Sequence, residues 1–190
     1  LTTFTLSAWI NPDNAVTSNY GLPIFEHRDG GNVNYEYAID GSGNVSGFDG
    51  TMTVAYSNGS FYNLRGTQAI SSGSWQHIAF TYDGSTGAFT HYHNGVAAGS
   101  GTASPPIITN PSNTLSIGRS DDQGNNPLEF DGGLDDMRIY DEALSPAQIM
   151  LLYSIGNEFK CAQTDTCSNA GVIDYITDQG AFAYCDGVRI

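Results

Sequence analysis

Short apolar runs alternate along this chain with clusters of Gly, Asn, Asp and Ser. Where apolar and polar residues alternate, or where a few apolar residues stand together between turn signals, the pattern predicts a β-strand. By this criterion strands are expected at residues 4–10, 22–26, 34–39, 52–56, 75–82, 88–94, 115–118 and 133–140. Asn58-Gly59 is a tight-hairpin signal, and residues 83–87 separate the strands of the clearest hairpin. Strands spaced in this way predict an all-β antiparallel sandwich rather than βαβ units.

One segment, residues 145–153, predicts a helix. Ser145 can cap the first free amides and Pro146 suits the first turn, while Ile149, Leu152 and Tyr153 form one apolar face. We expect this helix to pack against the sandwich as a closing element. Because the composition changes after it, the sequence predicts a β-sandwich domain at 1–154 and a cysteine-bearing extension at 155–190.

The net charge of −14 disfavours nucleic acid and anionic membranes as partners, because phosphate groups would be repelled. Fifteen Asp stand against five Glu, and short carboxylates suit turns and loops that bind divalent cations. An acidic coat that keeps the protein soluble is the alternative interpretation. No stretch reaches the ~18 apolar residues that a membrane span needs, so membrane insertion is not expected. The chain begins with Leu1 rather than Met, which suggests a processed or trimmed product.

All three cysteines, Cys161, Cys167 and Cys185, lie in the last part of the chain. An odd number predicts one disulfide and one free or intermolecular thiol. Cys161 with Cys167 and Cys167 with Cys185 are both acceptable pairs, and the choice stays open. A zinc site is less favoured, because three cysteines without a nearby histidine leave the tetrahedron incomplete.

Five segments, in order, resemble the laminin-G-like, concanavalin-A-like jelly-roll family. They are Phe4-Thr-Leu-Ser-Ala-Trp-Ile-Asn-Pro-Asp13, Trp75-Gln-His-Ile-Ala-Phe-Thr-Tyr-Asp-Gly84, Tyr92-His-Asn-Gly-Val96, Phe130-Asp-Gly-Gly-Leu-Asp-Asp-Met-Arg-Ile-Tyr140 and Ala143-Leu-Ser-Pro-Ala-Gln-Ile149. The resemblance covers residues 1–154 and implies a jelly-roll sandwich of two antiparallel sheets with a short closing helix. It also implies a secreted or cell-surface module of the kind found in adhesins, glycan-binding appendages and matrix proteins. It does not settle the ligand.

The chain departs from the family at its start, where a Phe-Asp-Gly-like segment normally precedes the first strand seen here. The tail, Ala181-Phe-Ala-Tyr-Cys-Asp186-Gly187-Val188, looks like that segment. It could fold back as a permuted strand, belong to the start of a following repeat, or insert into a neighbouring subunit as a donor strand. An irregular tail held by a disulfide is the plainer alternative.

Calcium is the cofactor that the resemblance implies. In the family a metal commonly lies between the Asp of the Gly-Gly-Leu-Asp135 strand and an Asp-Gly of the opening segment, a part that Asp186 could play. Carboxylate and carbonyl oxygens are the ligands that calcium prefers. Alternatively, Asp135 accepts backbone hydrogen bonds or pairs with Arg138. A second, less favoured metal loop comprises Asp121, Asp122, Glu129 and Asp131.

Three histidines form a weaker candidate site. His91 and His93 alternate on one predicted strand, and His77 lies on its hairpin partner, so the three could approach one another and hold zinc or copper. Ring packing and hydrogen bonding within the sheet are the favoured interpretation.

Sugar binding would use exposed aromatic rings beside Asn, Asp or Gln. Residues in or near predicted turns could serve, although core positions in strands are at least as well supported: Tyr20, Tyr35, Tyr37, Phe61 and Tyr62. Two sequons, beginning at Asn44 and Asn58, also lie in predicted turns.

Signs of catalysis are missing. The chain has no Glu-x-Asp-x-x-Glu strand, no Gly-x-Ser-x-Gly elbow, no His-Glu-x-x-His helix and no phosphate loop. We therefore expect a non-catalytic, calcium-stabilised extracellular module that binds a glycan or an extracellular protein. The alternatives are a self-associating subunit of a surface filament or repeat array, and an accessory domain of a glycoside hydrolase.

Overall fold

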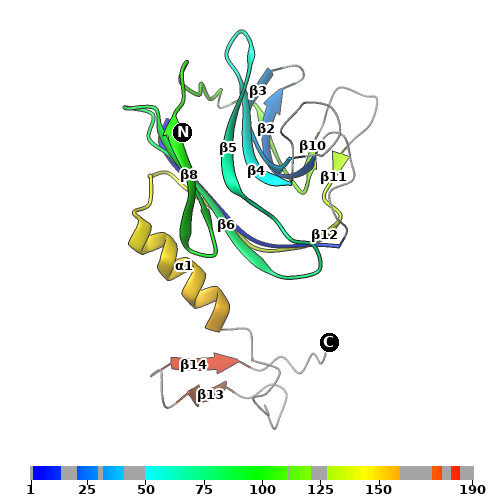
Figure 1. The fold of residues 1–190 in the computed structure, drawn as a ribbon, viewed down its shortest axis with the longest axis vertical. Coiled ribbons are helices and arrows are strands. Elements are labelled where there is room, and N and C mark those ends of the chain that lie inside the picture. Colours follow the sequence, from blue (N-terminus) through cyan, green and yellow to red (C-terminus); the bar gives the residue numbers. More distant parts are fainter. Residues whose placement is uncertain are drawn as a thin grey trace.

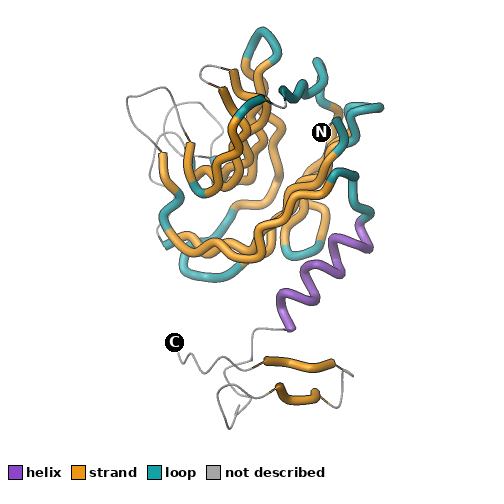
Figure 2. Tube along the Cα trace, turned by 180° about the vertical axis from the view of Figure 1, so that it is seen from behind, coloured by secondary structure: helices purple, strands orange, loops and turns teal. Residues whose placement is uncertain are grey.

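The computed structural model describes residues 2–13, 21–29, 32–40, 50–110, 112–120, 128–158, 173–176 and 181–184. Their strands build two five-stranded antiparallel sheets packed face to face (Figures 1 and 2). The sandwich predicted from the alternating pattern, with a single helix after its last long strand, is confirmed within these residues.

Sheet A has the order β12-β1-β6-β7-β8. Its strands are β12 (Gly132–Tyr140), β1 (Phe4–Pro12), β6 (Gln76–Tyr82), β7 (Ala88–His93) and β8 (Val96–Thr102). Sheet B has the order β5-β4-β3-β2-β9. Its strands are β5 (Phe61–Ala69), β4 (Thr51–Ser57), β3 (Asn32–Ile39), β2 (Leu22–Asp29) and β9 (Thr114–Ile117). Two small pairs complete the described strands: β10 (Arg119–Ser120) with β11 (Leu128–Glu129), and β13 (Ile173–Ile176) with β14 (Ala181–Tyr184).

The core lies between the two sheets and follows the period of two along each strand. Phe4, Leu6, Ala8 and Ile10 of β1 are fully buried and point toward sheet B. The Phe4 ring stacks on Tyr35 of β3, with the ring centroids 4.9 Å apart. Aromatic residues from both sheets thus fill the interior.

Two strands of the five-stranded sheets, β5 and β8, were missing from the prediction. They are the edge strands of the two sheets on one side of the sandwich, and glycines let them approach closely. A Cβ added to Gly99 would lie 3.0 Å from Cα of Gly66. Gly, Ala, Ser and Thr dominate β8, so the apolar alternation that marks a strand is weak there.

Helix α1 (Pro146–Glu158) packs on the outer face of sheet A (Figure 1). Ser145 caps it: Gln148 N donates to Ser145 Oγ at 3.4 Å, while Ser145 N donates to Gln148 Oε1 at 2.8 Å. Ile149 is fully buried against sheet A. The helix ends five residues later than the predicted end at 153 and crosses the predicted domain boundary at 154, which stays a prediction.

Candidate functional site

The outer face of sheet B, turned away from the core, carries charged and polar side chains. We call this set the polar face: Glu26, Arg28, Glu36, Asp40, Asn63 and Arg65. The register explains the grouping, because Glu36 lies opposite Glu26 on one side and opposite Ala55 on the other, and Ala55 lies opposite Asn63. Directly opposite residues of an antiparallel pair share a face, so these side chains meet.

The inner part of the polar face is a buried ionic network. Glu26 is only 1% exposed and accepts a hydrogen bond from Ser120 Oγ at 2.7 Å. Arg28 Nε lies 2.9 Å from Glu26 Oε1, and its Nη2 lies 3.8 Å from Glu36 Oε2. Buried charges are tolerated only when they are paired. We therefore interpret this network as structural, because its side chains bind one another and are almost fully buried.

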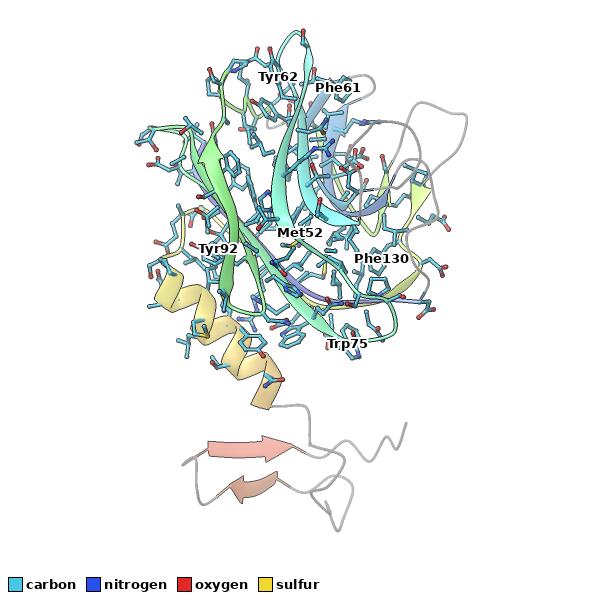
Figure 3. The ribbon with its side chains drawn as sticks, viewed as in Figure 1. Met52, Phe61, Tyr62, Trp75, Tyr92 and Phe130 are labelled. Carbon is cyan, nitrogen blue, oxygen red and sulfur yellow. The ribbon has the colours of Figure 1, made fainter. Side chains whose placement is uncertain are left out.

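The outer part of the polar face is open along β5. Phe61, Asn63 and Arg65 alternate along this strand and therefore share one side of it. The Phe61 side chain is 63% exposed, and Figure 3 shows it beside Tyr62 near one end of the sheet. Arg65 is partly exposed and lies 3.5 Å from Asp40 Oδ2. We call these three residues the β5 rim.

The described tyrosines that were predicted to bind sugar do not lie on the β5 rim. Tyr35 and Tyr37 are core residues, and burial raises the pKa of Tyr35 to about 12. The Tyr37 hydroxyl donates to Met52 Sδ at 3.2 Å. Tyr62 is half-buried and stacks on Tyr56, while Tyr20 lies outside the described residues. Neither Tyr35 nor Tyr37 presents a ring to a ligand outside the sandwich.

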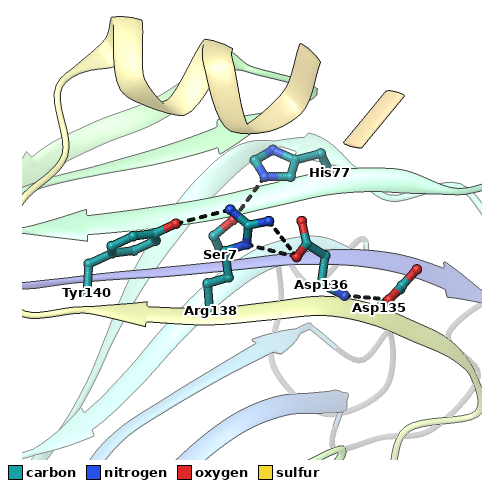
Figure 4. Close-up of polar contacts among 6 residues, drawn as sticks. All are labelled: Ser7, His77, Asp135, Asp136, Arg138 and Tyr140. Carbon is teal, nitrogen blue, oxygen red and sulfur yellow. Dashed lines mark hydrogen bonds and ion pairs between the residues drawn. The ribbon is translucent and has the colours of Figure 1, made fainter. Parts of the chain in front are cut away.

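Asp135 lies exposed on β12, where a bulge interrupts the pairing with β1. Its Oδ1 accepts a hydrogen bond from the Asp136 backbone N at 2.7 Å (Figure 4). Arg138 pairs with Asp136 instead, with Nη2 2.7 Å from Asp136 Oδ1. Asp135 therefore accepts a backbone hydrogen bond, which was one of the two alternatives to metal binding. The other alternative, a pairing with Arg138, is not observed.

The remaining predicted metal ligands are only partly within the described residues. Glu129 and Asp131 are exposed near β11, whereas Asp121, Asp122, Asp186 and the three cysteines lie outside the described residues. In the described ranges, no three carboxylate, histidine or cysteine side chains converge on a point where a metal ion could bind. The pairing of Asp135 with Asp186 in a calcium site stays a prediction.

The three histidines do not meet. His77 lies on the outer face of sheet A, while His91 points into the core and donates from Nε2 to the Leu64 carbonyl oxygen at 3.1 Å. His93 donates from Nε2 to Gln76 Oε1 at 3.0 Å. Ring packing and hydrogen bonding, the favoured interpretation, are what the structure shows.

Sequence reasoning overlooked a Ser–His contact beneath helix α1. Ser7 Oγ lies 2.9 Å from His77 Nε2 (Figure 4). Ser7 is 2% exposed, and burial lowers the pKa of His77 to about 4, so the imidazole is neutral at pH 7. A nucleophilic serine needs access to substrate and a base held by a third group, whereas His77 Nδ1 has no hydrogen-bond partner among the described residues. The pair is a packing element.

Residues 1–150 match the family model Laminin_G_3, the concanavalin A-like lectin/glucanases superfamily. The chain belongs to this superfamily. The resemblance inferred from five sequence segments is thereby confirmed.

Two curated proteins are similar in sequence to most of the sandwich. The chain is 29% identical over 155 residues to "Sushi, von Willebrand factor type A, EGF and pentraxin domain-containing protein 1" of Rattus norvegicus, and 28% identical to the protein of the same name from Mus musculus. The match covers 79% of this chain but only 4% of either relative. The similarity therefore concerns one domain of a very long protein.

Two solved structures share the fold. Domain 4 of AbnA, a GH43 extracellular arabinanase from Geobacillus stearothermophilus solved with arabinotriose, has a TM-score of 0.61 and 28% identity, covering 80% of this chain and 66% of that one. The CBM40 of the Ruminococcus gnavus IT-sialidase, bound to α2,3-sialyllactose, has a TM-score of 0.61 at 17% identity, covering 80% of this chain and 82% of that one. Each of these two structures was solved with an oligosaccharide, and at 17% identity the second shows the fold alone.

Proposed function

We propose that this chain is a non-catalytic carbohydrate-binding module that holds its ligand on the β5 rim. The observation that carries the proposal is the 28% identity with the AbnA domain, which was solved with an arabinose trisaccharide. The β5 rim supplies an exposed aromatic ring, an amide and a guanidinium on one side of a strand. Such a set offers an apolar contact for a sugar ring together with donors and acceptors for its hydroxyl groups.

The charge balance favours a neutral glycan. On the polar face, three carboxylates, Glu26, Glu36 and Asp40, stand against two guanidinium groups, Arg28 and Arg65, which are paired with them. The chain as a whole carries −14, so a sialylated or sulfated sugar would meet repulsion. We therefore expect neutral arabino-oligosaccharides to bind this surface better than sialyllactose.

Titration calorimetry of the whole chain with arabinotriose and with α2,3-sialyllactose tests the proposal. We expect arabinotriose to bind and Phe61→Ala to weaken binding at least tenfold, about 1.4 kcal/mol. Val96→Ala is the matched control, because Val96 is 60% exposed on β8 of the other sheet. Absence of neutral-sugar binding, here and across a glycan array, would refute the proposal, and a preference for sialyllactose would refute its charge argument.

The similarity to the AbnA domain also supports a proposal about where this protein is located. The AbnA domain comes from an extracellular arabinanase, which supports a secreted or cell-surface location and the form of the hypothesis in which the module accompanies a hydrolase. No helix within the described ranges is long and apolar enough to span a membrane. Calcium remains part of the proposal, with Asp135 as its ligand among the described residues.

A further inference from the structure

In the part of the chain that the structure describes, the edge strands β9 and β12 have no further strand between them. Among the described strands, β12 pairs only with β1, and β9 pairs only with β2. The two edges meet at Gly118, where an added Cβ would lie 3.1 Å from Leu134 Cδ1. Phe130 N also donates to the Gly118 carbonyl oxygen at 2.8 Å. The unpaired backbone groups of β12 and β9 therefore border one gap.

Two apolar side chains line this gap on the core-facing side of sheet B. The register places Leu115 opposite His27 and Ile117 opposite Phe25, and Phe25 is buried in the core. Nevertheless Leu115 is 44% exposed and Ile117 is 52% exposed. Within the described residues, sheet A therefore leaves about half of each of these two side chains uncovered. A strand added to the unpaired edge of β12 would lie across from both residues, because neighbouring strands are ~4.8 Å apart.

The β13–β14 hairpin has the composition that such a position needs. Its register pairs Ile173 with Tyr184 and Tyr175 with Phe182, so these four positions share one face of the hairpin. The opposite face carries the Asp174, Ile176, Ala181 and Ala183 positions. An isolated two-stranded hairpin is marginally stable in water, and each of its strands has one unpaired edge. The hairpin therefore offers a large apolar face to cover Leu115 and Ile117 and a free strand edge that can pair with β12.

We infer that the β13–β14 hairpin of the same chain adds to the unpaired edge of β12 and covers Leu115 and Ile117 with its aromatic face. Helix α1 ends beside this edge, because Gly156 contacts Trp9, and Trp9 lies opposite Asp135 of β12. The edge is about two strand spacings, ~10 Å, from Trp9. Residues 159–172 can extend to ~45 Å, so the hairpin reaches β12 within one chain. Strand addition to an exposed sheet edge is a common binding mode.

The test is a double-mutant cycle on the full chain, read by thermal unfolding. If the hairpin covers Ile117, then Ile117→Asp and Phe182→Asp should each lower Tm by about 4 °C or more. The double variant should lose no more than the larger single effect, because the first change already breaks the contact. Val96→Asp is the control, and its effect should simply add to that of Phe182→Asp. Size-exclusion chromatography with light scattering should show a monomer, and hydrogen exchange should show protected amides along β12.

Three results would overturn the inference. A nearly neutral Ile117→Asp would show that this half-exposed residue stays uncovered. Additive effects of Ile117→Asp and Phe182→Asp would show that the two positions do not touch. Coupling found only in a dimer would show that the hairpin is exchanged between copies rather than docked within one chain. None of these outcomes depends on sugar binding, so the inference stands apart from the proposed function.

Discussion

Lowering the pH from 7 to 4.5 should destabilise the sandwich through two buried histidines. His77 is 1% exposed and His91 fully buried, and burial lowers the pKa of each imidazole from 6.5 to about 4. In the unfolded chain both become protonated below pH 6.5, whereas in the fold they stay neutral down to about pH 4. The stability present above pH 6.5 is therefore lost as the pH falls, and the loss levels off below pH 4.

The magnitude follows from these pKa values. At about 1.4 kcal/mol per pH unit, the full difference corresponds to about 3 kcal/mol for each histidine, and about 2 kcal/mol of it is reached by pH 4.5. Two such losses are a large part of the 5–15 kcal/mol that stabilises a typical domain. Ordinary carboxylates protonate below this window, and hydrogen bonds from Ser85 and Thr86 lower the pKa of Asp83 further.

Urea unfolding at several pH values from 7 to 4.5 measures the effect. In His91→Gln the amide can still donate to the Leu64 carbonyl oxygen, and in His77→Gln it remains beside Ser7, so both variants remove the proton-binding group and keep a polar partner. We expect the double variant to lose much less free energy of unfolding over this pH range than the unmodified chain. Equal losses in the two proteins would refute the assignment of acid sensitivity to these histidines.

Two further predictions concern helix α1 and calcium. A Cβ at Gly156 would overlap the Trp9 indole, so Gly156→Ala should lower the free energy of unfolding by about 1–3 kcal/mol despite the better helix propensity of Ala. Urea unfolding checks this, and an unchanged or raised stability would show that the helix shifts without cost. Millimolar calcium should raise the Tm of the unmodified chain, and Asp135→Asn should remove most of that rise. A Tm that is the same in calcium and in EDTA would contradict the calcium proposal.

The polar and apolar pattern along the chain was sufficient for most of the fold. Alternation located β1, β3, β4 and β6 to within a few residues, and Asn58-Gly59 marked the turn between β4 and β5. The start of helix α1 was predictable because Ser145 and Pro146 act locally, on the first turn alone. Each of these features depends on neighbours in the sequence.

The candidate site was not predictable in the same way. Alternation shows that Tyr35 and Tyr37 share one face of β3 and that Glu36 lies on the other, but not which face the second sheet covers. Only packing decided that the tyrosines are buried and that Glu36 joins the polar face. Packing also decided that His91 lies in the core, whereas His77 lies beneath helix α1.

The sequence by itself therefore determined most of the long strands, several turns and the start of the helix, because these follow from local backbone preference and a period of two. Its five ordered segments also indicated the family. The tertiary structure decided which charges are buried, which aromatic rings are exposed and which described strands have an unpaired edge. These properties depend on contacts between residues far apart in the chain, such as Gly66 with Gly99 and Gly118 with Leu134. No local pattern encodes those contacts, since glycine carries no side chain to signal a close approach.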